Sequence, residues 1–114
     1  MGRFFAKSAT CAAGHKHDSR AEAKRCDVLQ QAQERGEITS LRIHPAFDFL
    51  INGLPVKMAN GHKMKFTGDF EYMKDGAWTV EDVKAKNGFM SRDVPVKLAL
   101  LRHIYPHITW QVVA

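Results

Sequence analysis

Two aspartates and a lysine in the second half of the chain have the residue types and spacing of a metal-dependent phosphodiester site. Asp69 lies on one side of the dipeptide Asp75-Gly76, and Asp82 and Lys84 lie on the other. Carboxylates bind Mg²⁺ together with water molecules and substrate phosphate oxygens, and a nearby ammonium group stabilises negative charge on a phosphate. The alternative is an ordinary solvated pair of Asp82 with Lys84, which would contribute little to stability.

The residues around these positions predict a β-hairpin. Asp-Gly is favoured in two-residue type I′ turns because both central residues need a positive φ. A two-residue turn pairs Asp69 with Asp82 and Thr67 with Lys84, and places the aspartates on one face, at the end away from the turn. Like charges placed opposite each other repel, so this pairing favours a bound divalent cation over a purely structural role.

Composition and charge narrow the class of protein. At 114 residues the chain fits one domain with a single core. No apolar run is long enough to span a bilayer, so we expect no membrane association and a cytoplasmic location. The formal net charge of +5 and the pI of about 9.4 favour a polyanionic partner, DNA first, although a basic domain without a site is the alternative.

The two cysteines do not predict a disulfide, because the chain has the features of a cytosolic protein. Cys11 and Cys26 could join His15 and His17 in a four-ligand zinc site. Their spacing matches no compact zinc module, however. We therefore expect mobile N-terminal residues and a Cys26 that packs on a helix.

The first helix begins at a capping box. Ser19 and Glu22 have the S-x-x-E spacing that starts a helix, and Gly36 is a typical stop. Residues 1–17 lack periodicity, so the chain divides into an N-terminal arm (1–17) and a domain (18–114). The buried stripe of this helix is expected at Ala21, Val28, Leu29 and Ala32, with Cys26 at its edge.

The remaining elements predict an α/β (α+β) fold. Strands are expected around 38–43 and 47–51, followed by the hairpin, a second helix over 93–105 and a final strand over 108–113. The order helix, strands, helix, strand indicates one mixed sheet flanked by helices. The second helix could allow the final strand to pair parallel to the second hairpin strand.

These motifs resemble the PD-(D/E)XK nuclease superfamily. The match is Asp69 on one strand and Asp82-Val83-Lys84 on the next, within the αβββαβ order of its restriction-endonuclease-like core. Gly68 stands where the proline of the motif would be. The segments HDSRAEAKR, TGDFEY and VEDVKA look like those of a small phage-encoded family of this superfamily.

The chain is also similar to the dimeric Holliday-junction resolvases, which add a glutamate from the first helix. Carried over by position, that glutamate is Glu22. The resemblance implies Mg²⁺, with Mn²⁺ as an alternative, held by Glu22, Asp69, Asp82 and the carbonyl of Val83. Lys84 would complete the catalytic set by stabilising charge on the phosphate. The rival interpretation of Glu22 is the capping box alone.

Five basic residues are candidates for contacts with the DNA backbone: Arg20, Lys65, Lys86, Arg92 and Lys97. Residues at the start of the second helix could grip a phosphate with the help of its amides, but a solvated surface explains them equally well. Phe70 and Trp78 could stack on bases. Aromatic residues in a hairpin are more often buried, and we expect them in the core.

The sequence therefore predicts a Mg²⁺-dependent DNA endonuclease from a phage or prophage, acting in the cytoplasm of a bacterial host. A Holliday junction or other branched DNA is the expected substrate, because so short a chain has little room for a base-reading module. A homodimer would cut two strands. The alternatives are a non-catalytic DNA-binding or accessory protein on a nuclease fold, and a small regulatory protein that acts on a host protein.

Overall fold

The central sheet has four strands in the order β10-β9-β8-β3. The computed structural model describes residues 8–17, 19–84 and 93–113. The strands of the sheet are β3 (Thr39–Ile43), β8 (Phe70–Lys74), β9 (Ala77–Val83) and β10 (Ile108–Val113). β8 is antiparallel to both of its neighbours, whereas β10 is parallel to β9, as the sequence suggested. The α/β class is confirmed.

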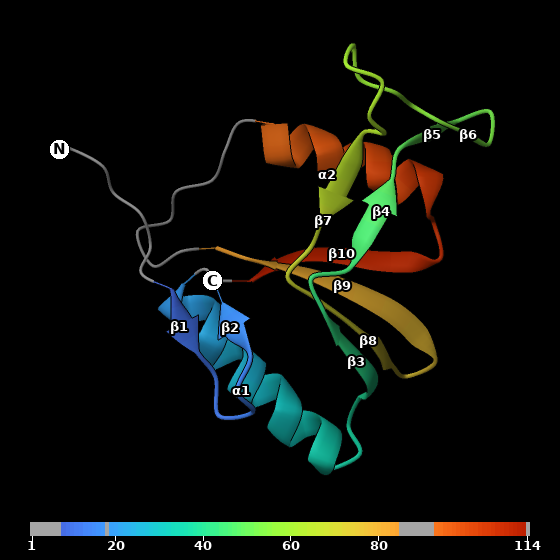
Figure 1. The fold of residues 1–114 in the computed structure, drawn as a ribbon. Helices are drawn as coiled ribbons and strands as arrows, with labels where there is room; N and C mark the ends of the chain where they lie inside the picture. The colour runs from blue at the N-terminus through green and yellow to red at the C-terminus, as the bar shows by residue number, and fades with distance from the viewer. Residues whose placement is uncertain (1–7, 18, 85–92, 114) are drawn as a thin grey trace, which may run out of the picture.

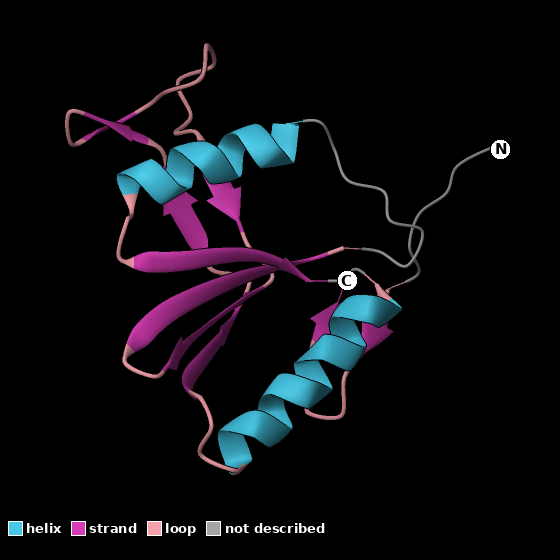
Figure 2. Ribbon diagram, turned by 180° about the vertical axis from the view of Figure 1, so that it is seen from behind, coloured by secondary structure: helices cyan, strands magenta, loops and turns pink. Residues whose placement is uncertain are grey.

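One helix covers each face of this sheet. Figures 1 and 2 show α1 (Arg20–Glu34) and α2 (Asp93–Ile104) on opposite sides of the four strands. α1 packs over Ile38, Phe70 and Tyr72, and α2 packs over Val80 and Trp110. One apolar core therefore lies on each side of the sheet. Neither helix of the described residues is long and apolar enough to cross a bilayer.

The β8–β9 hairpin has the predicted register up to its open end. Phe70 pairs with Glu81, and Lys74 pairs with Ala77 across the turn, where Asp75 and Gly76 have φ values of 51° and 78°. Both central residues thus adopt the left-handed conformation that a type I′ turn needs. Phe70 is fully buried, as expected.

The predicted hairpin strand is interrupted at Gly68. β7 (Lys65–Thr67) leaves the sheet and pairs with β4 (Ala46–Asp48), so Thr67 lies opposite Ala46 and the predicted pairing with Lys84 is wrong. Gly68 N donates to the carbonyl of Pro45 at 2.9 Å. At this break the chain passes so close to β9 that only glycine fits. A Cβ on Gly68 would lie 2.8 Å from Val80 Cγ1.

An extension carries the chain from β4 to β7. It includes β5 (Leu50–Ile51) and β6 (Leu54–Pro55), which project past α2 in Figure 1. The sequence indicated one strand over 47–51, but Phe49 separates β4 from β5 and turns into the α2 core. Phe49 is buried in this core. Its N–H donates to the carbonyl of Met64 and its carbonyl accepts from Val56 N, and these two bonds close the base of the extension.

The N-terminal residues 8–17, assigned to an arm from the sequence, form a small hairpin on α1. Its strands are β1 (Ala9–Thr10) and β2 (Lys16–His17), which pair antiparallel and contact α1. This hairpin changes which side of α1 is buried. Cys26 is fully buried, whereas Val28, which was expected in the buried stripe, is 48% exposed.

We predict that Gly68→Ala destabilises the fold. Val80 is 1% exposed and β-branched, so its methyl group cannot move away from a Cβ placed at 2.8 Å. The free energy of unfolding in denaturant should fall by about 1–3 kcal/mol, the usual cost of overpacking. Thr67→Ala, at the exposed neighbouring position, is the control and should change stability little. An unchanged midpoint for Gly68→Ala would contradict the close approach.

Candidate functional site

Glu22 lies in the first turn of α1 with its carboxylate directed away from the cap. The Ser19 half of the capping box forms, because Ser19 Oγ accepts a hydrogen bond from Glu22 N at 3.1 Å. The carboxylate is 3% exposed and binds two histidines: His17 Nδ1 and, at 3.1 Å, His44 Nε2. Both contacts use the same oxygen, Oε2. The side chain therefore has a role beyond capping the helix.

Asp69 occupies the bend between β7 and β8 and is held from three sides. Its N–H donates to the carbonyl of Glu81 at 2.9 Å, and its carbonyl accepts from His44 N at 3.0 Å. Its carboxylate oxygen Oδ2 accepts from Val83 N at 2.5 Å. The Asp69 side chain thus accepts the hydrogen bond that the N–H of Val83, at the end of β9, would otherwise donate to a backbone carbonyl of the neighbouring strand. This arrangement fixes the Asp69 carboxylate against the end of β9.

Asp69 is the carboxylate that links the other two predicted ones, because Glu22 and Asp82 each neighbour Asp69 and not each other. The carboxyl group of Asp69 lies within hydrogen-bonding reach of both Glu22 and Asp82. Burial raises the pKa of Asp69 to about 6, and the neighbouring Glu22 adds to the increase. Burial and the adjacent charge of Asp69 raise the pKa of Asp82 to about 7. The half-buried aspartates therefore repel each other when both are ionised.

Lys84 follows directly after β9. Its N–H donates to the carbonyl of Val113 at 2.6 Å, which continues the pairing of β9 with β10. The residue is partly buried. The alternation of side chains along β9 places Lys84 on the same face as Asp82. Asp82 and Val83 thus contact Asp69 at the end of β9, and Lys84 follows them on the face of Asp82.

Glu81 lies on the opposite face of β9 and serves a structural role. Arg25 of α1 donates to both of its carboxylate oxygens, at 2.8 and 2.6 Å. Tyr72 OH and Gln111 Nε2 also donate to this fully buried carboxylate. Burial acts to raise the pKa of Glu81, but the hydrogen bonds from Arg25 and Tyr72 outweigh it and hold the pKa below its usual range.

The three described residues among the basic ones predicted to contact DNA lie on three different elements. Arg20 at the start of α1 and Lys65 at the start of β7 are exposed. Lys97 forms an ion pair with Asp93 one turn earlier on α2, at 2.7 Å. Lys86 and Arg92 lie outside the described residues. Arg20 is the nearest of these in sequence to the carboxylates, two positions before Glu22.

Sequence reasoning missed the histidines around Glu22. One ligand atom from each of His17, Glu22 and His44 lies within 4.8 Å of the others. His44 has no ligand spacing in the sequence, so the sequence alone predicts no role for it. It reaches Glu22 because it has a φ of 54°, in the break between β3 and β4, and such a conformation in a non-glycine residue is often associated with a functional site.

The chain belongs to a known family. Residues 1–114 match the family described as "Protein of unknown function (DUF1064)". Searches of curated proteins and of solved structures gave no match. Membership of this family is established, but the description of the family assigns no activity.

We predict that Asp82→Asn stabilises the protein when no divalent metal is added. A carboxyl group whose folded pKa is raised makes the protein more stable as it gains its proton, so the ionised group is unfavourable above pH 7. The variant should gain about 1–2 kcal/mol near pH 8, after allowance for partial exposure. The gain should shrink as the pH falls to about 5, where the wild-type group is protonated.

Thermal unfolding at several pH values measures this gain. Asp75→Asn is the matched control, because it makes the same change in the exposed hairpin turn, and Asn-Gly also suits that turn. Equal or lower stability of Asp82→Asn at every pH would contradict the repulsion between the two aspartates.

A second prediction concerns the ion pair on the other face. Arg25→Met leaves the fully buried Glu81 without its cation, and should lower the free energy of unfolding by about 2–4 kcal/mol. Arg35→Met is the control, because the Arg35–Glu37 pair is more than half exposed and should contribute little. Urea denaturation measures both variants. An Arg25→Met protein as stable as Arg35→Met would show that the pair does not hold α1 on the sheet.

Proposed function

We propose that this protein is a metal-dependent DNA endonuclease that hydrolyses phosphodiester bonds. One observation carries the proposal: Asp69, in the bend before β8, has Glu22 of α1 on one side and Asp82 near the end of β9 on the other, and Lys84 follows directly after β9. Such a carboxylate group with an adjacent lysine suits the binding of a divalent cation and a phosphate.

The carboxylates fit Mg²⁺ or Mn²⁺. Two aspartates whose pKa values are raised to about 6 and about 7 repel each other at neutral pH, and a shared cation would relieve that repulsion. The histidines use only Oε2 of Glu22, which leaves Oε1 for a metal or a metal-bound water. All three groups offer oxygen, the ligand atom that these hard cations prefer. The carbonyl of Val83 would be a further ligand.

The protein groups have distinct roles in this proposal. The N–H of Val83 orients the Asp69 carboxylate through Oδ2, and the two histidines orient Glu22. Lys84 binds the scissile phosphate and stabilises the negative charge that develops on it. Glu22, Asp69, Asp82 and the carbonyl of Val83 would hold the cation, which would supply Lewis acidity toward the phosphate and the attacking water. Glu81 takes no part, because it is saturated by Arg25, Tyr72 and Gln111.

The arrangement of the chain supports this interpretation. Along the central sheet and its two helices the order is α1, β3, β8, β9, α2, β10, which is the αβββαβ order of the PD-(D/E)XK nucleases that the sequence resembles. Gly68 replaces the proline of that motif where a side chain would collide with Val80. The departure thus has a local steric reason and does not affect the carboxylates.

The proposed substrate is branched DNA, such as a Holliday junction, and the proposed setting is the cytoplasm of a bacterial host of a phage or prophage. The net charge of +5 favours binding to DNA without a sequence-reading element. Cutting two strands of a junction requires two sites, so the proposal includes a homodimer. Ile51, Leu54 and Met58 on the extension are more than half exposed and suit a contact between protomers.

The proposal predicts metal-dependent cleavage. The protein should be incubated with a labelled four-way junction, a linear duplex or a single strand, with Mg²⁺, with Mn²⁺ or without added metal. We expect cleavage of the junction that requires metal and falls by about 100-fold or more in Asp82→Ala and in Lys84→Ala, which remove a metal ligand and the phosphate contact. Product formation on denaturing gels measures the rate.

Matched controls separate the site from general effects. Lys74→Ala removes an exposed lysine at the other end of the hairpin, and Asp75→Asn removes a carboxylate there, so both should cleave at the wild-type rate. Tight binding of DNA without cleavage under every condition would favour the accessory protein instead. Cleavage that survives both Asp82→Ala and Lys84→Ala would show that the site assignment is wrong.

A further inference from the structure

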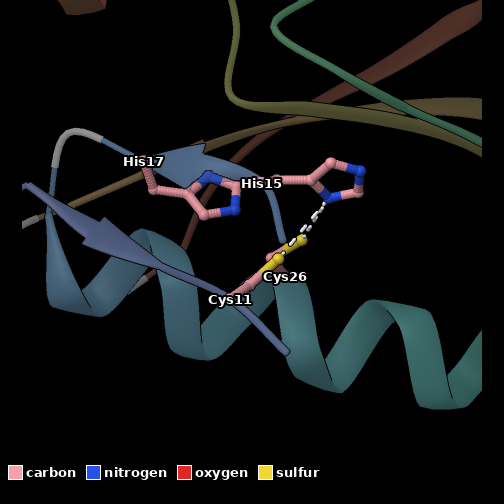
Figure 3. A group of neighbouring side chains, drawn as sticks. All are labelled: Cys11, His15, His17 and Cys26. Atoms are coloured by element: carbon pink, nitrogen blue, oxygen red, sulfur yellow. Dashed lines mark hydrogen bonds between the residues drawn. The ribbon is translucent and has the colours of Figure 1, made fainter. Parts of the chain in front are cut away.

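Four metal-ligating side chains meet between the N-terminal hairpin and α1. Cys11, His15 and His17 come from the hairpin and Cys26 from α1, and one ligand atom of each lies within 4.8 Å of the others. Figure 3 shows the two imidazole rings and the two sulfur atoms turned toward a common centre. The cysteines are free thiols in this structure, not a disulfide.

The distances fit a tetrahedral zinc site. With Zn–S and Zn–N bonds of about 2.3 and 2.05 Å, a sulfur and a nitrogen on one tetrahedron lie about 3.6 Å apart. His15 Nδ1 lies 3.4 Å from Cys11 Sγ and 3.6 Å from Cys26 Sγ. A ring nitrogen has either one lone pair or one N–H, so His15 Nδ1 cannot form a full hydrogen bond with both thiols at once. A shared cation explains why it approaches both.

His17 supplies an independent indication of a ligand. Its ring is buried, and its Nε2 is the one buried side-chain nitrogen or oxygen in the described residues that has no hydrogen-bond partner. Its Nδ1 is bonded to the Glu22 carboxylate. Zinc-binding histidines usually donate their other ring N–H to a carboxylate, which leaves the free nitrogen for the metal. His17 is arranged in this way, with Nε2 available on the side of the sulfurs.

The backbone folds tightly around Cys11. Cys11 N donates to the carbonyl of His15 at 3.0 Å, and Gly14 N donates to the carbonyl of Cys11 at 2.9 Å, which holds Cys11 and His15 close together. Gly14 allows this tight loop because its φ of 88° is a conformation that other residues rarely adopt.

The geometry points to a structural Zn²⁺ site formed by Cys11 Sγ, His15 Nδ1, His17 Nε2 and Cys26 Sγ. Four protein ligands and the burial of both cysteines and His17 define a closed site, which is typical of structural zinc rather than catalytic zinc. Sulfur and imidazole ligands also separate it from the carboxylate cluster, which suits Mg²⁺. The zinc site does not depend on the proposed nuclease activity.

Zinc would fasten the N-terminal hairpin to α1. The paired strands of this hairpin have only two residues each, too few to remain folded without further support. A bound zinc would supply that support, together with the bond from Ala12 N to Asp27 Oδ1 at 2.7 Å. It would also fix the ring of His17, whose Nδ1 positions the carboxylate of Glu22. His17 is a positioning residue for Glu22 in this arrangement.

Metal analysis of the purified full-length protein tests the site directly. Protein expressed in zinc-supplemented medium and purified without chelators should contain one zinc per chain by mass spectrometry of the elements. X-ray absorption at the zinc edge should give two sulfur and two nitrogen ligands, with Zn–S near 2.3 Å. Zinc well below one per chain in the folded protein, a Cys11–Cys26 disulfide in its intact mass, or an oxygen-only shell would overturn the assignment.

Variants locate the metal. Cys26→Ser and His15→Ala should each lose at least tenfold in zinc affinity, measured by competition with a chromophoric chelator. Asp82→Asn and His62→Ala, which lie outside the cluster, should keep wild-type affinity. Circular dichroism checks the folding of each variant, and His15, which is less buried than Cys26, provides a test if Cys26→Ser does not fold. Zinc retained in a folded His15→Ala, or lost in Asp82→Asn, would contradict the site.

Discussion

The bidentate ion pair between Arg25 and Glu81 fixes α1 against the central sheet, and the arrangement of the carboxylates depends on it. Arg25 lies one turn after Glu22 on α1, and Glu81 is the residue before Asp82 on β9. Since the pair joins these two elements at one point, it also sets the distance between the first turn of α1 and the end of β9. Glu22 therefore reaches Asp69 because its neighbour three residues on is anchored.

Side chains alternate between the two faces of β9, so residues that stabilise the fold and residues of the candidate site lie on opposite faces. Glu81 points into the core beneath α1, where Arg25 and Tyr72 satisfy it, whereas Asp82 lies on the other face beside Asp69. A buried charge that is fully paired stabilises the fold only if its partners stay in place. Two half-buried aspartates beside each other reduce stability instead, which is typical of residues kept for binding.

The sequence was sufficient to predict both helices, the strands of the central sheet and the proximity of Asp69 to Asp82. Asp75-Gly76 determined the hairpin register, and the capping box located the start of α1, because both signals are local. The break at Gly68 was not predictable, since it results from the close approach of Val80, a residue twelve positions away. The role of His44 and the hairpin over residues 8–17 were missed for the same reason, because both are set by tertiary contacts. The group of Cys11, His15, His17 and Cys26 was named from the sequence, but its spacing spoke against a zinc site that only the folded hairpin brings together.

Diffraction from a crystal soaked in Mn²⁺ would test the central claim, that Asp69 and Asp82 bind a divalent cation. Data at a wavelength where manganese scatters anomalously give a map of the metal alone. The account predicts an anomalous peak within bonding distance of both carboxylates, about 2.2 Å from their oxygens, which is absent from Asp82→Asn crystals. A fully soaked crystal with no peak beside Asp69 and Asp82 would contradict it.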